Sequence, residues 1–229
     1  MAFFITKTVR CVILAILLYS GTQYFLRWKS YTFSPKVFRE KSIAAAQPAN
    51  GLSNVNKLRN DLSREYRDHI LDPTWEAVYG GGLLLRANFL HASLTEFIVA
   101  FHAAHRTQGF SGFHWINSTC TVLNGAVSRT LHSLHGGNKE TFKPGNNFRH
   151  GEFQRYFYEF SDDTYMVCYG RGAVPLSSLW LATGSISAAD PLSLVRIFYI
   201  YGHGSIHEIG FSLKKTFNYY KSRVVKSEL

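Results

Sequence analysis

Ten histidines and three cysteines are the side chains of this sequence that could hold a metal ion or act as nucleophiles. Two histidine pairs have a spacing that metal ligands use, His102 with His105 and His132 with His135. Neither pair is joined by the glutamate of a zinc-protease motif, and no cysteine lies close to either pair in the sequence. The sequence therefore predicts no metal site, and the histidines are expected on the surface or hydrogen-bonded within a core.

The three cysteines differ in their surroundings. Cys11 lies in an apolar N-terminal segment, whereas Cys120 and Cys168 lie 48 positions apart in segments with the pattern of β-strands. Buried single cysteines usually behave as small hydrophobic residues. In an oxidising compartment, however, two cysteines in one folded domain indicate a disulfide. Both interpretations stay open here, and Asn117 begins a glycosylation sequon that has meaning only in such a compartment.

The glycine motifs do not indicate a bound nucleotide. Gly170 and Gly172 lack the third glycine and the following helix of a dinucleotide-binding loop. Neither a nucleophile elbow nor a phosphate-binding lysine loop is present in the sequence. We therefore expect no cofactor.

The composition limits the class of protein that could position these residues. The 229 residues are enough for one good-sized core, and 46% hydrophobic with only 17% charged residues excludes an intrinsically disordered chain. The mean hydropathy of -0.08 excludes a membrane protein with many spans.

The net charge of +10 is concentrated at the N-terminus. Residues 1–60 contain nine basic side chains and one acidic one, while the remaining residues are nearly neutral. A nucleic-acid-binding protein would carry its basic patches on the folded domain. Basic residues beside an apolar segment instead favour anionic lipid headgroups, although a solubilising arm has the same composition. Membrane lipids are thus an expected partner and nucleic acids are not.

An unbroken apolar run, residues 11–19, extends in weaker form to Leu26 between Arg10 and Arg27. The 16 residues between these arginines form a helix of about 24 Å, which is short for a bilayer core of about 30 Å unless the flanking side chains reach outward. We expect an uncleaved membrane anchor over residues 1–29; a cleaved signal peptide is the alternative.

Two features of the sequence disagree on topology. More basic residues follow the apolar run than precede it, which predicts a cytoplasmic C-terminal part. The chain nevertheless ends in Lys226, Ser227, Glu228 and Leu229, close to a retrieval signal that works in the lumen of the endoplasmic reticulum. Both interpretations predict the endoplasmic reticulum membrane, with the nuclear envelope as a related location.

The pattern of polar, apolar and turn residues divides the remaining chain into three segments. Residues 30–79 form a polar, helical connector; residues 80–189 alternate short apolar runs with turns, as in a sandwich or barrel; residues 190–229 contain two amphipathic helices separated by a break at residues 202–204. The last two helices could lie on a membrane or pack on the barrel. The pattern of residues 89–106 fits either a helix or a strand.

Four motifs in order along the chain indicate a family. They are LHASLTEF at residues 90–97, SGFHW at 111–115, the pairs Pro-Gly and His-Gly between residues 144 and 151, and MVCYGRGAVP at 166–175. From about residue 80 to 175 the sequence strongly resembles the family of the sigma non-opioid intracellular receptor and the fungal sterol C-8 isomerase.

The resemblance implies a mainly β fold with flanking α-helices: a cupin-like β-barrel around a closed apolar pocket, an N-terminal transmembrane helix and two C-terminal amphipathic, membrane-facing helices. Family members resemble one another in forming homotrimers, so a homotrimer is expected. The resemblance makes residues 97–101 part of a strand. It places in the pocket Phe97, Val99, Phe101, His114, Ser118, Cys120, His150, Tyr158, Phe160 and Cys168.

The sequence departs from the family at the centre of that pocket. Two facing carboxylates of the family are replaced by Cys120 and Cys168, and a supporting tyrosine is replaced by Phe97. Shifting a sterol double bond needs an acid and a base, and a buried carboxylate is also the partner for a cationic amine. The resemblance therefore implies a non-catalytic protein that binds a sterol, a lipid or another apolar molecule, with no catalytic residues.

Because the family carboxylates face each other, Cys120 and Cys168 should also face each other, either bridged or as free thiols. Glu96 matches a buried structural glutamate of the family and is expected to bind backbone amides. Two other functions are kept as alternatives: a sterol C-8 to C-7 double-bond isomerase that uses His150, His114 or Glu159 instead, and a membrane scaffold or chaperone with a vestigial pocket.

Overall fold

The computed structural model describes residues 2–48, 50–71, 74–132 and 137–227, which form two compact units, Met1–Thr32 and Phe33–Leu229. The first unit is built around helix α1 (Ala2–Trp28). Its segment Thr6–Trp28 is long and apolar enough to cross a membrane. The 23 residues of this segment extend about 34 Å as a helix, which is enough to cross a bilayer core of about 30 Å. A signal sequence has the same properties, so the choice of an uncleaved anchor stays a prediction.

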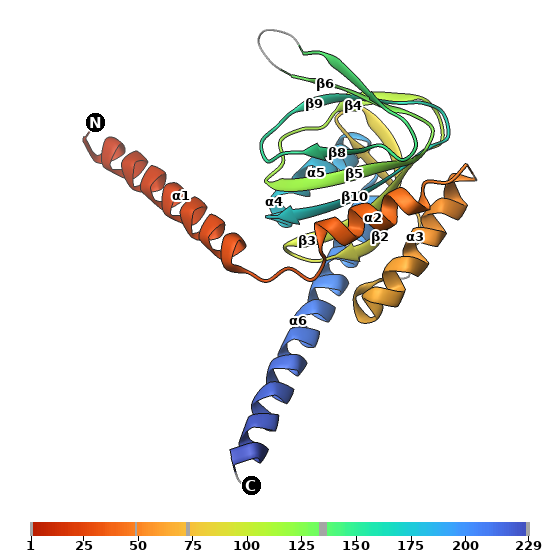
Figure 1. The fold of residues 1–229 in the computed structure, drawn as a ribbon. Helices are drawn as coiled ribbons and strands as arrows, with labels where there is room; N and C mark the ends of the chain where they lie inside the picture. Colours follow the sequence, from red (N-terminus) through yellow and green to blue (C-terminus); the bar gives the residue numbers. More distant parts are fainter. Residues whose placement is uncertain (1, 49, 72–73, 133–136, 228–229) are drawn as a thin grey trace. The chain divides into compact units, whose positions relative to one another are not determined.

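Two antiparallel sheets, whose inner faces share one hydrophobic core, form the body of the second unit (Figure 1). The larger sheet has six strands in the order β1 (Glu76–Gly80), β2 (Leu83–Ala92), β3 (Glu96–Ala103), β10 (Thr164–Gly172), β5 (Ile116–Asn124) and β8 (Asn147–His150). The smaller sheet has four strands in the order β4 (Thr107–Phe110), β9 (Tyr156–Phe160), β6 (Val127–Leu131) and β7 (Lys139–Phe142).

Helices α2 (Pro35–Ala45) and α3 (Gly51–Glu65), followed by the short 3-10 helix Arg67–His69, cover the outer face of the six-stranded sheet (Figure 1). Asn50 caps α3 by accepting a hydrogen bond from the Leu52 amide at 3.0 Å. The apolar residues of α3 recur at helical spacing and are buried against the sheet with Phe38 of α2. Because both faces of the central strand β10 are covered, every residue of this strand except Arg171 is buried.

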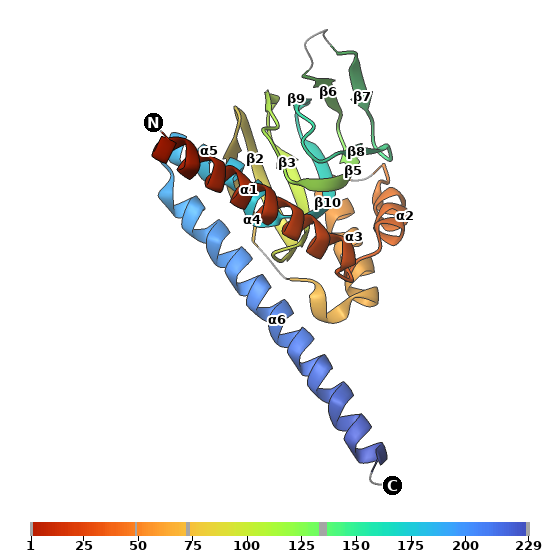
Figure 2. The ribbon, with the colours of Figure 1, turned by 90° about the vertical axis from the view of Figure 1, so that its left-hand side faces the viewer.

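The inner face is covered by the short helix α4 (Val174–Ser177), which contacts α5 (Leu179–Ser187), by α5 itself, which contacts β1, and by α6 (Pro191–Ser227), which contacts β1 and β2. Figure 2 shows α6 continuing past the strands as one long helix. The predicted break at residues 202–204 is wrong, because α6 runs through it. Gly204 serves a different purpose: a Cβ atom there would lie 2.2 Å from the Ala92 carbonyl oxygen, so the glycine lets the helix approach β2 closely.

Two predicted boundaries also differ from the structure. Strand β1 begins at Glu76, inside the segment predicted as a helical connector. Helix α4 begins at Val174, inside the segment predicted as barrel. The ambiguous segment of residues 89–106 consists of the end of β2 and the whole of β3, not a helix. His135 of the second histidine pair and the C-terminal Glu228 and Leu229 lie outside the described residues.

Candidate functional site

An apolar cavity of about 130 Å³ lies between the two sheets and the C-terminal helices. One water needs about 10 to 15 Å³ on the same measure, so the cavity has room for roughly ten water-sized volumes. Nine of the ten residues predicted for the pocket line it: Phe97, Val99, Phe101, His114, Ser118, His150, Tyr158, Phe160 and Cys168. Cys120 is not a lining residue, although it is buried in the same core.

The register of the larger sheet brings these residues together. One row of cross-strand neighbours runs Phe89, Val99, Cys168, Cys120 and Phe148 over five strands, and all five belong to the inner core. Residues two positions along each strand point to the same face, so the next row is also directed inward.

That second row runs Phe97, Gly170, Ser118 and His150. Gly170 is required there because a Cβ atom would lie 2.3 Å from the Phe97 ring. Phe97 therefore packs directly over Gly170 of β10. The alternation of apolar residues in β3 is thus the local sequence feature that forms this wall.

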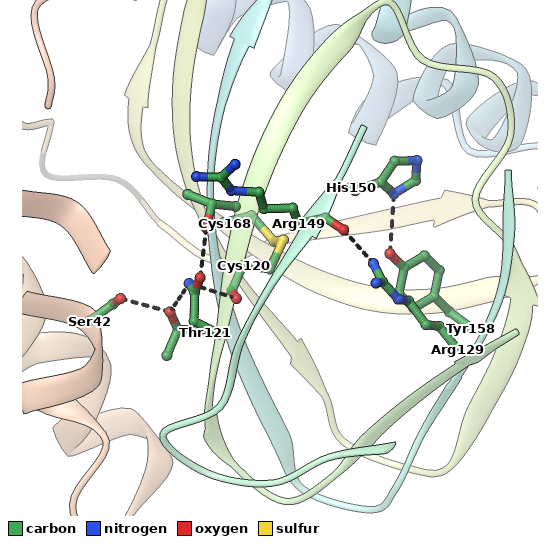
Figure 3. The surroundings of a disulfide bond; sticks show 10 residues. Ser42, Cys120, Thr121, Arg129, Arg149, His150, Tyr158 and Cys168 are labelled. Carbon is green, nitrogen blue, oxygen red and sulfur yellow. Dashed lines mark hydrogen bonds between the residues drawn. A yellow bond between two sulfur atoms is a disulfide. The ribbon is translucent and has the colours of Figure 1, made fainter. Parts of the chain in front are cut away.

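Cys120 and Cys168 are joined by a disulfide between directly opposed residues of β5 and β10 (Figure 3). Their Cα atoms are 4.1 Å apart. Bonded cysteines carry no ionisable proton, so these two residues supply neither an acid nor a base. On the opposite face of β5, Thr121 hydrogen-bonds to Ser42 of α2 at 2.7 Å, which fixes the helical layer to the same strand.

The polar wall of the cavity contains a fixed hydrogen-bond chain. The Nε2 atom of His150 lies 2.8 Å from the Gln154 carbonyl oxygen, and Nδ1 lies 3.1 Å from the Tyr158 hydroxyl (Figure 3). A carbonyl only accepts, so Nε2 carries the proton and Nδ1 accepts from the hydroxyl. Burial lowers the pKa of His150 to about 4, with smaller contributions from His114 and Arg129. His150 is therefore neutral at physiological pH and both its nitrogens are occupied.

Arg129 lies behind this chain as a buried cation. Its guanidinium group packs on the rings of Phe142, Phe148 and Tyr156 at 4.4 to 5.2 Å, and its Nε donates to Glu140 at 2.7 Å. Burial acts most strongly and disfavours the charge, but the Glu140 carboxylate together with Tyr158 and Tyr156 outweighs it, so the pKa of Arg129 is raised above its ordinary value. This pair leaves no net charge beside the cavity, because each charge is matched by the other.

One buried polar atom of the cavity wall, Nδ1 of His114, has no hydrogen-bond partner among the described residues. Burial lowers the pKa of His114. Backbone hydrogen bonds with Ser111 and Ser177 offset this lowering only in part, so the ring is neutral. His114 packs edge to face on His150, with ring centroids 5.7 Å apart, and Ser118 is the cross-strand neighbour of His150. The three residues form one polar end of the cavity.

No Asp or Glu is found among the lining residues within the described part of the chain. Glu159, named as a substitute catalytic acid, is not in the cavity: it pairs with Arg106 and Lys139 on the outer side of β9. These two cations lower the pKa of Glu159, with Lys139 the stronger influence. Within the same described residues, no cluster of three His, Cys, Asp or Glu side chains suited to a metal ion occurs.

Glu96 lies on the other face of the sheet, at the first position of β3. Its carboxylate accepts hydrogen bonds from the Phe33 amide at 3.2 Å and from the Tyr169 hydroxyl at 2.8 Å. The Tyr169 hydroxyl is also 3.1 Å from the Phe33 carbonyl oxygen. The glutamate thus joins the segment before α2 to strands β3 and β10, at a distance from the cavity wall.

Sequence reasoning did not find the residues that the helices contribute to the cavity. Trp180 and Leu181 come from α5, and Tyr201 comes from α6. The Tyr201 ring packs against Phe89 with centroids 5.4 Å apart, and burial alone raises the pKa of its hydroxyl. The alternation of Leu83 and Leu85 along β2 could have been recognised as an inward face. The helical residues gave no such signal, because their direction depends on how the helices pack.

Comparison with known proteins gives three kinds of match. A family model described as ERG2 and Sigma1 receptor like protein matches residues 8–212. The sigma non-opioid intracellular receptor 1 of Danio rerio is 30% identical over 88% of this chain and 93% of its own length. The receptor of Xenopus tropicalis is 32% identical over 79% of this chain and 82% of its own length.

Two solved structures resemble part of the chain. An RmlC-like cupin from Shewanella frigidimarina covers 44% of this chain and 86% of its own, with a TM-score of 0.38 and 14% identity. KdgF from a Halomonas species covers 45% of this chain and 94% of its own, with the same TM-score and identity.

Proposed function

The chain belongs to the ERG2 and Sigma1 receptor like protein family, and from this membership we propose that it binds a neutral, apolar small molecule, such as a sterol or another lipid, without transforming it. The observation that carries the proposal is the Cys120–Cys168 disulfide in the position of the family's carboxylates, beside a cavity without acidic lining residues. The apolar walls favour an apolar ligand through burial of its surface.

The chemistry of the cavity argues against a double-bond shift. Such a reaction needs one group that protonates a carbon and another that removes a proton. His150 has both nitrogens engaged and a pKa of about 4, and the pKa of His114 is lowered by burial. Tyr158 is a very weak acid because burial raises its pKa. None of these groups replaces a pair of facing carboxylates.

A cationic amine should bind weakly for a related reason. A buried cation without a counter-ion costs several kcal/mol, and removing one partner of a buried ion pair typically costs about 3 to 5 kcal/mol. Glu140, which contacts the buried Arg129 beside the cavity, is already paired with that arginine. We therefore propose that the ligand is uncharged.

Sterol turnover in microsomes tests the non-catalytic part of the proposal. The wild-type chain should give no shift of the C-8 double bond above microsomes that lack it. Turnover by wild type would overturn the proposal. The double variant Cys120→Asp, Cys168→Glu is the matched comparison, because it changes only the two positions on which the proposal rests. Tighter binding of a hydrophobic amine by this variant than by wild type is expected.

We also propose that the protein resides in the endoplasmic reticulum membrane with the sheets on the oxidising side, and that it assembles as a homotrimer. The disulfide and the exposed Asn117 side chain on β5 support the oxidising side. Exposed apolar side chains of α5 and α6 support contact with membrane lipids; they are Leu179, Ile186, Leu192, Val195, Phe198, Ile206, Ile209 and Leu213. Glycosidase sensitivity of Asn117 and native mass spectrometry in detergent test orientation and assembly.

A further inference from the structure

We infer that one end of the six-stranded sheet inserts into the surface of a lipid bilayer through two aromatic side chains of its loops, Phe113 and Phe153. This inference rests on the proposed membrane residence and extends the lipid contact from α5 and α6 to the loops of the sheet. The partner is the boundary between the headgroups and the acyl chains of the bilayer.

The two ends of the six-stranded sheet expose different kinds of side chain. At one end β3 and β5 begin and β10 ends, because the register pairs Arg171 with Glu96 and Gly172 with Ile116. The exposed large apolar residues of the connections at this end are Leu94, Phe113, Leu176 and Leu179. At the opposite end the exposed connection residues are mainly polar or charged, among them His105, Arg106, Lys143, Asn146, Asp162 and Asp163. A cluster of exposed apolar side chains at one end indicates a contact surface there.

The two aromatic residues are held in place by the protein although they are not part of its core. Phe113 is 61% exposed, and its ring stacks on Phe153 with centroids 4.8 Å apart. Phe153 has a φ of 63°, a left-handed backbone conformation that bulky residues rarely adopt. Its amide donates to the His114 carbonyl oxygen at 2.9 Å, which joins the two loops. Backbone strain of this kind is concentrated at functional sites, so we assign the stacked pair a role outside the core.

The loop of residues 111–115 is fixed to the helices that carry the neighbouring exposed leucines. The Trp115 amide donates to the Ser177 hydroxyl of α4 at 2.9 Å. A Cβ atom at Gly112 would lie 2.4 Å from the Trp180 ring, so the loop approaches α5 closely. The exposed apolar side chains of this loop, α4 and α5 therefore belong to one side of the molecule. Phenylalanine and leucine on such a surface favour the headgroup and acyl-chain boundary of a bilayer.

The chain also enters the folded unit at this end of the sheet. The Phe33 amide donates to the carboxylate of Glu96, the first residue of β3, at 3.2 Å. Only residues 29–32 separate Phe33 from α1, which contains the segment long and apolar enough to cross a membrane. This stretch spans at most about 18 Å, so a bilayer crossed by α1 is within reach of this end.

Spin labels on single cysteines test the inference in the full chain, reconstituted in vesicles of phosphatidylcholine and phosphatidylserine. The background is Cys11→Ala, which removes the exposed free cysteine and leaves the disulfide intact. Labels on Phe113→Cys and Phe153→Cys should be accessible to oxygen, shielded from a water-soluble nickel chelate, and about 5 to 10 Å below the phosphates. The matched control, Lys143→Cys at the polar end, should be accessible to the chelate. Phe198→Cys reports on the proposed lipid contact of α6.

A second measurement leaves both aromatic residues unchanged. A phospholipid with a diazirine on its acyl chain, photolysed in vesicles that contain wild type, should form adducts in the peptide with residues 111–115 and in the peptide with Phe153. It should form none in the peptide with residues 143–146. Adducts confined to other parts of wild type would overturn the inference, even if a labelled variant fails to fold.

The outcomes of the labelling experiment separate the inference from the membrane residence on which it rests. Chelate-accessible labels at positions 113 and 153, with a lipid-exposed label at position 198, would overturn the inference and leave the proposed residence standing. Chelate-accessible labels at all three positions would overturn both the inference and the proposed lipid contact of α6. Immobile labels at positions 113 and 153 that are shielded from oxygen as well as from the chelate would indicate contact with a second copy of the chain, and would also overturn the inference.

Discussion

Breaking the bond between Cys120 and Cys168 should destabilise the folded unit by an amount that follows from the separation of the two residues. The bond closes a loop that spans a sequence separation of 48. In the chain-entropy model, a loop of this length contributes about 4 kcal/mol at 25 °C. For a domain of this size, 1 kcal/mol corresponds to roughly 2 to 4 °C in melting temperature. We therefore expect a decrease of roughly 8 to 16 °C.

Thermal unfolding in detergent, followed by near-ultraviolet circular dichroism, measures the change. Reduction of wild type keeps both sulfur atoms in the core, and the Cys120→Ala, Cys168→Ala variant removes them. The variant should therefore melt somewhat lower than reduced wild type, because it also loses buried volume. The matched control is Cys11→Ala, an exposed free cysteine, which should melt like wild type under both conditions. An unchanged melting temperature after verified reduction would refute the reasoning.

Three further predictions concern the structure around the cavity. Glu96→Gln should lower the free energy of unfolding by about 1 to 3 kcal/mol, because it weakens the charge-assisted hydrogen bonds to the Phe33 amide and the Tyr169 hydroxyl. Sterol binding should stay unchanged. Urea unfolding measures the first effect and equilibrium binding the second. Gly170→Ala should weaken ligand binding and lower the melting temperature, since the added methyl group displaces the Phe97 ring; a change in neither would contradict the packing. The free energy of unfolding should be highest above about pH 6.5 and should fall by up to about 3 kcal/mol toward pH 4. The reason is that His150 takes up a proton near pH 6.5 in the unfolded chain but only near pH 4 in the folded one. His150→Phe should therefore flatten this part of the pH profile of chemical unfolding.

Local pattern alone predicted much of the second unit. The apolar spacing of Val55, Leu58 and Leu62 predicted the helix that covers the sheet, and turn residues indicated strands between them. The pattern around β3 was ambiguous, because Phe97, Val99 and Phe101 fit one face of a strand, whereas the apolar residues between Leu90 and Phe101 also fit a helix. The resemblance to a known family resolved it, and the same resemblance placed nine of the lining residues.

Other features depended on contacts that a sequence does not display. A break in α6 was predicted because Gly202 and Gly204 weaken a helix, yet each glycine costs only about 1 kcal/mol relative to alanine. The close approach of Gly204 to Ala92 is a tertiary contact that a local rule cannot anticipate. For the same reason, Trp180 and Tyr201 could not be assigned to the cavity from the sequence.

The most direct measurement is mass spectrometry of the lipids that co-purify with the full-length chain, extracted from the folded and detergent-washed protein. The predicted result is one neutral, apolar lipid bound in near-stoichiometric amount to wild type. The Gly170→Ala variant, in which the cavity wall is displaced, should retain less of it. Recovery of a cationic amine from wild type, or of no lipid at all, would contradict the conclusion that an uncharged chamber selects an uncharged ligand.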